Sequence, residues 1–119
     1  MNMDKTAREL AEELTRKLNQ LNDDYQEILK LHEMLEEAEI PHAMLRKLDG
    51  WQIGYPALEP ITGRVCSVIE HRYSYGWEQD LLEIMGLLTA EEEQWDNVCG
   101  HLTAEDVFAR IKAHWEERR

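Results

Sequence analysis

The residues with the clearest chemical potential lie in one short segment of the chain, Glu70–Trp77. This segment brings together an arginine, a serine and three aromatic residues: Arg72, Tyr73, Ser74, Tyr75 and Trp77. An arginine guanidinium can donate paired hydrogen bonds to a phosphate or a carboxylate. Aromatic side chains offer flat faces on which a base can stack. The combination predicts a binding site for a small anionic ligand that resembles a nucleotide.

The expected neighbours of this segment strengthen that prediction. It lies between a predicted buried strand and a predicted helix that starts near Trp77. The unpaired N–H groups at the start of a helix attract anions. Arg46 and Arg64, expected on or beside the sheet, would add positive charge to the site. A structural alternative stays open, in which the aromatic residues cover the core and Arg72 neutralises nearby acids.

Other kinds of chemistry have weaker support in the sequence. There is no Gly-x-Ser-x-Gly motif and no glycine-rich phosphate loop. We expect none of the five histidines to ligate a metal, and we interpret His32 as a packing or specificity residue within an apolar stripe. A metal site assembled only by the fold stays open. We therefore predict a protein that is not an enzyme and that carries no metal and no cofactor.

Charge limits the possible partners. The chain of 119 residues carries a formal charge of −12, which repels nucleic acids and anionic membranes. Between Tyr73 and Ala109 there is no lysine or arginine, but there are nine acids: Glu78, Asp80, Glu83, Glu91, Glu92, Glu93, Asp96, Glu105 and Asp106. The first residues are polar and no apolar run approaches the roughly 20 residues that cross a bilayer. We expect no contact with membranes or nucleic acids, and a cytoplasmic location.

The first 40 residues contain the most regular pattern. Apolar residues recur at alternating spacings of four and three, which predicts a coiled-coil-like helix from about Asp4 to Ala38. We expect this helix to form a homo-oligomer through Leu14, Leu18, Leu21, Tyr25 and Ile28. Apolar positions multiply after Ile28, so the second half of the helix should also contact the globular body. The alternative is a helix that folds back on its own domain.

The remainder of the chain, residues 41–119, predicts an α+β body that forms a single domain with the helical segment 1–40. Three strands of an antiparallel sheet are expected at Ala43–Leu48, Trp51–Tyr55 and Val65–His71, with a tight turn at Asp49–Gly50. Three helices should follow, over Trp77–Leu88, from Thr89 to about Trp95, and from Thr103. Thr89 with Glu92, and Thr103 with Asp106, have the spacing of helix caps.

Four stretches resemble a group of short phage and mobile-element proteins of Firmicutes, for which no activity is assigned. The stretches are residues 32–38, Val65–His71 with the Ser-Tyr-Gly that follows, Asp80–Thr89 and residues 102–108. The resemblance transfers no binding residue by position. What it implies is a context, because small non-enzymatic phage proteins of this kind often counteract host defence.

Two function hypotheses follow. In the first, an oligomer sequesters a small anionic nucleotide signal of host immunity in the bacterial cytosol. In the second, the acidic surface binds a host defence protein that handles nucleic acid, as an anti-CRISPR does. A structural or accessory phage protein is a further alternative.

Overall fold

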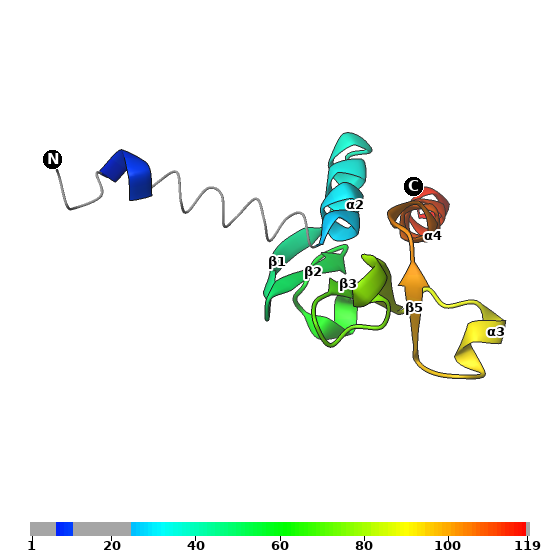
Figure 1. Cartoon of the computed structure of the whole chain (residues 1–119). Coiled ribbons are helices and arrows are strands. Elements are labelled where there is room, and N and C mark those ends of the chain that lie inside the picture. Colours follow the sequence, from blue (N-terminus) through cyan, green and yellow to red (C-terminus); the bar gives the residue numbers. More distant parts are fainter. Residues whose placement is uncertain (1–6, 11–24, 119) are drawn as a thin grey trace, which may run out of the picture.

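The fold is an antiparallel sheet with two helices packed on one face (Figure 1). A computed structural model describes residues 7–10 and 25–118. From residue 25 on, its helices and strands are, in chain order, α2 (Gln26–Glu37), β1 (Ala43–Lys47), β2 (Gly50–Tyr55), β3 (Cys66–Glu70), β4 (Leu82–Met85), α3 (Ala90–Glu93), β5 (Val98–Leu102) and α4 (Ala104–Glu117). Two short 3₁₀ turns, η1 (Ile61–Gly63) and η2 (Trp77–Gln79), interrupt the loops.

The five strands lie side by side in the order of the sequence, and each pairs antiparallel with the next. One row across four of them is apolar, because Met44, Ile53, Val68 and Ile84 are cross-strand partners. Gly50 begins β2 at a point where a Cβ atom would lie only 1.8 Å from the Glu70 carbonyl oxygen. Glycine therefore allows β2 and β3 to approach each other here.

Helices α2 and α4 cover this apolar face and contact each other (Figure 1). Helix α2 buries Ile28, Leu31 and Leu35, and α4 buries Val107 and Ile111. Their spacings of three and four residues place each set on one side of its helix. The core therefore lies between one face of the sheet and the two helices, as the α+β prediction requires.

The sheet is larger than the sequence indicated. We expected three strands, but β4 and β5 extend the sheet to five. The predicted helix over Trp77–Leu88 is wrong: only the turn η2 forms there, and β4 follows it. Leu82 and Ile84 are buried while Glu83 and Met85 between and after them are not, which is the alternation of a strand. The apolar residues of this stretch fit both periods, and pairing with β3 and β5 decides between them.

The prediction of a coiled-coil-like helix is also wrong. Helix α2 begins at Gln26, after Tyr25 with a non-helical backbone (φ −133°, ψ 66°). Tyr25 and Ile28, which we expected between copies of the chain, are 4% and 0% exposed within its own core. The expected contact between the second half of the helix and the globular body is confirmed. Leu14, Leu18 and Leu21 lie outside the described residues.

Distant acids cap the start of α2. The amide of Glu27 donates to Asp80 (3.1 Å) and the amide of Ile28 donates to Glu70 (3.2 Å). Glu70 is fully buried, and burial together with the neighbouring Asp80 carboxylate raises its pKa to about 9. The Glu27 carboxylate in turn accepts the first amide of α4, that of Ala104, at 2.8 Å. These bonds fasten the start of both helices to each other and to the sheet.

The two expected capping boxes are confirmed at the starts of α3 and α4. Arg110 on α4 donates two hydrogen bonds of 2.7 Å to the Glu92 carboxylate on α3, and these lower the pKa of Glu92 to about 2. This bidentate pair ties the outlying α3 to the body of the protein. Within the described residues, no helix has the length and apolar character needed to span a membrane.

Candidate functional site

The segment that we singled out in the sequence forms a tightly bonded turn between β3 and η2. Ser74 is buried, and its hydroxyl donates to the His71 carbonyl (2.8 Å) and accepts from the His71 amide (3.0 Å). The His71 ring nitrogen Nδ1 accepts the amide of Tyr73 (3.1 Å), and burial lowers the pKa of His71. Ser74 and His71 therefore shape the turn, and the hydroxyl of Ser74, which we predicted to bind a ligand, is buried and bonded within the turn.

The same turn exposes the arginine and the aromatic residues. Tyr73 is 70% exposed, Tyr75 is 56% exposed and Trp77 is 37% exposed, and Arg72 is exposed as well. The structural alternative, in which these rings cover the core, does not fit such exposure. The predicted helix start is absent, however, because η2 has only three residues. The start of a longer helix therefore adds no affinity for an anion here.

A cleft of about 460 Å³ lies beside this turn and is lined by Tyr25, Asp49, Arg72, Trp77 and Glu78. The Arg72 guanidinium lies 5.1 Å from the centre of the Tyr73 ring, within the range of a cation–π contact. Arg72 therefore brings a flat, positively charged group to the cleft, with the Tyr73 ring against it.

Asp49 holds one wall of this cleft in place. It accepts hydrogen bonds from the Tyr25 hydroxyl and from the Arg72 amide (3.1 Å). Burial favours the neutral acid, but these hydrogen bonds outweigh it and lower the pKa of Asp49, so the group is a carboxylate at neutral pH. The cleft thus combines one cation, Arg72, with the acids Asp49 and Glu78.

The other two predicted arginines do not line the cleft. Arg46 on β1 lies over the ring of Trp51, 4.6 Å from its centre. Arg64 precedes β3 whereas Arg72 follows it, so the two lie at opposite ends of a strand that is roughly 17 Å long. The structure brings Arg72 and Trp77 to one cleft and leaves Arg46 and Arg64 apart from it.

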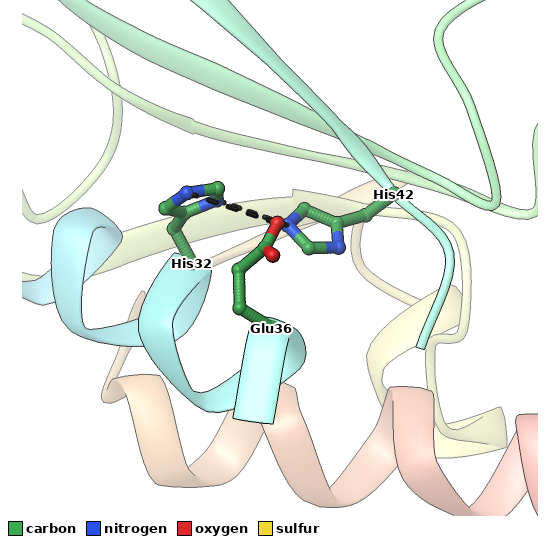
Figure 2. A group of neighbouring side chains, drawn as sticks. All are labelled: His32, Glu36 and His42. Atoms are coloured by element: carbon green, nitrogen blue, oxygen red, sulfur yellow. Dashed lines mark hydrogen bonds and ion pairs between the residues drawn. The ribbon is translucent and has the colours of Figure 1, made fainter. Parts of the chain in front are cut away.

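A second cluster, which the sequence analysis missed, lies at the other end of α2. His32 and Glu36 are four residues apart on the helix, and His42 precedes β1; Figure 2 shows the three side chains turned toward one another. The ring nitrogens His32 Nδ1 and His42 Nε2 are 2.9 Å apart, and Glu36 Oε1 lies 3.4 Å from His42 Nε2. Two imidazoles and a carboxylate are a donor set that divalent transition metals accept. We expected no metal ligand among the histidines.

Part of this cluster was visible in the sequence. The i,i+4 spacing of His32 and Glu36 places both side chains on one face of a helix. His42 joins them because the chain reverses between Ala38 and Pro41, where Glu39 has a positive φ of 56° and the Ile40 amide donates to the Leu35 carbonyl (3.0 Å). Pro41 signals the end of the helix, but no local pattern places His42 beside His32 and Glu36.

In comparisons with known proteins, no family model, no curated protein and no solved structure matches this chain.

Proposed function

We propose that this chain is a non-enzymatic binding protein that holds a small anionic nucleotide in the cleft beside Arg72. The observation that carries the proposal is the placement of Arg72, stacked on the exposed Tyr73, and Trp77 on one cleft of about 460 Å³. That volume lies within the usual range of small-molecule sites.

The side chains of the cleft match the parts of a nucleotide. Arg72 can donate paired hydrogen bonds to a phosphate. Trp77 in the cleft, and the exposed Tyr73 beside Arg72, offer faces for a base, and stacking on an aromatic side chain contributes about 1–3 kcal/mol per base. Asp49 and Glu78 accept hydrogen bonds, which suits the hydroxyl groups of a ribose or the amino groups of a base.

The charges narrow the ligand class. One arginine faces two carboxylates at the cleft, and the chain as a whole carries a charge of −12. A ligand with several terminal phosphates would be repelled. A nucleotide with one charge per phosphate, such as a cyclic nucleotide, fits this balance better. The proposal is therefore sequestration of a cyclic nucleotide signal, which agrees with the counter-defence role in the bacterial cytosol that the resemblance to phage proteins implies.

Isothermal titration calorimetry against cyclic mono- and dinucleotides and cyclic ADP-ribose derivatives tests the proposal. Arg72→Ala should weaken binding about tenfold to a hundredfold, the effect of losing a charge-assisted hydrogen bond of about 1.5–3 kcal/mol. Arg64→Ala is the matched control, because it removes the same charge at the far end of β3, and its affinity should equal that of the wild type. Failure of every nucleotide to bind below millimolar concentration, or equal affinities of Arg72→Ala and Arg64→Ala, would contradict the proposal.

A second function, binding to a basic host protein, has support from the region around α3. Glu91 and Glu93 are exposed on this helix, and the neighbouring Trp95 is 83% exposed. An exposed tryptophan beside acids suits an interface with a positively charged groove meant for nucleic acid. Charge reversal of Glu91 and Glu93 together should abolish capture of such a nucleic-acid-binding protein, whereas Glu92 must stay intact because it holds Arg110. Capture that survives the double reversal would exclude this surface.

A further inference from the structure

We propose that His32, Glu36 and His42 bind one divalent transition-metal ion of the zinc class. Zinc bonds to nitrogen and oxygen at about 2.0–2.1 Å, so neighbouring ligand atoms in a tetrahedral site lie about 3.3 Å apart. Two of the separations here are 2.9 Å, between His32 Nδ1 and His42 Nε2, and 3.4 Å, between His42 Nε2 and Glu36 Oε1. The ligand atoms of all three residues lie within 4.8 Å of one another. Small side-chain rotations of His32 and Glu36 would bring them to bonding distance around one ion.

The central ligand, His42, is oriented before any ion arrives. Its side chain is only 3% exposed, and its Nδ1 lies 2.8 Å from the Ile40 carbonyl oxygen. A carbonyl only accepts, so Nδ1 carries a hydrogen, and in the neutral ring the lone pair is on Nε2, the atom that faces His32 and Glu36 (Figure 2). This is the second-shell arrangement that commonly fixes the tautomer of a metal-binding histidine.

Without an ion, a single hydrogen lies between the two facing ring nitrogens, His32 Nδ1 and His42 Nε2. Because His42 Nε2 is an acceptor, His32 Nδ1 donates to it over 2.9 Å. When an ion binds, the hydrogen on neutral His32 moves to Nε2 of the same ring, and both facing lone pairs become ligands. No net proton is released in that step. The Glu36 carboxylate, which is 63% exposed, supplies a negative charge beside the ion.

Three protein ligands leave a fourth position for water or another small ligand, as in zinc sites whose fourth ligand exchanges. A cavity of about 270 Å³ adjoins the cluster and is lined in part by Glu36, Glu39 and His42. The inference does not depend on the nucleotide proposal. Tyr25, at the cleft, and Glu36 lie at opposite ends of α2, a helix of 12 residues that is roughly 18 Å long.

The test uses the full chain without a histidine tag, loaded with Zn²⁺, dialysed, and analysed for metal by mass spectrometry. We expect one bound zinc ion per chain. After the same treatment with Mg²⁺, which prefers oxygen ligands, we expect no bound magnesium. His32→Ala and Glu36→Gln should each weaken zinc binding at least tenfold, because even the partners of metal ligands contribute about 10–100-fold. His101→Asn is the matched control: this exposed histidine lies outside the cluster, and asparagine tolerates its positive φ of 61°. It should bind zinc as the wild type does.

Substitution of Co²⁺ gives a second measurement. A tetrahedral cobalt site absorbs visible light strongly, and His32→Ala should lose that absorption while His101→Asn keeps it. Glu36 and His32 are partly exposed, so their variants should fold, and far-UV circular dichroism would verify this. Wild-type protein that retains no stoichiometric zinc, or folded His32→Ala and Glu36→Gln that retain it as tightly as His101→Asn, would overturn the proposal.

Discussion

The two ends of α2 use similar side chains in opposite ways. At the start of the helix, the side chains of the buried Glu70 and the partly buried Asp80 accept hydrogen bonds from the amides of Ile28 and Glu27, so an oxygen lone pair of each acid meets a backbone donor. At the other end, His32, Glu36 and His42 bring several lone pairs together with one hydrogen between them, beside a cavity. An acid that meets backbone donors inside the core holds the fold together. An acid that meets other acceptors at the surface is available to a ligand.

The pH dependence of stability gives the largest test of this difference. Unfolded Glu70 loses its proton near pH 4.5, whereas the folded protein retains it up to about pH 9. Between these values the folded state binds more protons, so Glu70 contributes its full stability below pH 4.5 and progressively less as the pH rises toward 9. Glu70→Gln keeps the acceptor for Ile28 and has no proton to lose. We expect this variant to be more stable than the wild type by about 3 kcal/mol near pH 7, with a smaller gain near pH 5.

Urea unfolding of both proteins at pH 5, 6, 7 and 8 measures this gain. The difference between the two curves cancels the titration of His71 and of the other groups that both proteins share. Glu92 should not contribute, since its pKa of about 2 moves its effect to pH values below 4.5. A difference that stays constant from pH 5 to pH 8 would show that Glu70 is ionised in the fold.

Removal of a whole side chain at each end of α2 should distinguish their contributions to stability more directly. At pH 5, Glu70→Ala leaves the buried Ile28 amide without its acceptor, which should cost about 2 kcal/mol or more. Glu36→Ala, without added metal, removes an exposed side chain and should change stability by no more than about 0.5 kcal/mol. Urea midpoints at pH 5 measure both. Equal losses at the two positions would mean that the start of α2 is not held by Glu70.

The range over which each interaction acts explains what the sequence could predict. The starts of α3 and α4 were predicted because their capping residues are three positions apart. The cap of α2 could not be predicted in this way, because Glu70 is 42 residues from Ile28 and Asp80 is 53 residues from Glu27. The stretch Leu82–Met85 fitted a helix until pairing on both sides with β3 and β5 made it a strand.

The two candidate sites follow the same rule. Exposed Arg72, Tyr73 and Trp77 are neighbours in the sequence, and their shared surface was predicted. Asp49 reaches the same cleft from the β1–β2 turn, 23 residues before Arg72. Its place in the cleft was not predicted. In the second cluster, only the spacing of His32 and Glu36 was available, because His42 is placed by the reversal after α2.

A smaller loss than that of Glu70→Ala is expected where a helix has both a local and a distant cap. At the start of α4, the Thr103 hydroxyl accepts the Asp106 amide (3.1 Å), while the Ala104 amide is satisfied separately by Glu27 from α2 (2.8 Å). Thr103→Ala removes only the first bond, so it should lower the free energy of unfolding by about 1 kcal/mol. Thr62→Ala, at an exposed position in η1, is the control and should be neutral within about 0.5 kcal/mol. Urea unfolding of both variants measures the two effects. A loss of stability in Thr103→Ala as large as that in Glu70→Ala would mean that the local capping box, and not the bond from Glu27, holds the start of α4.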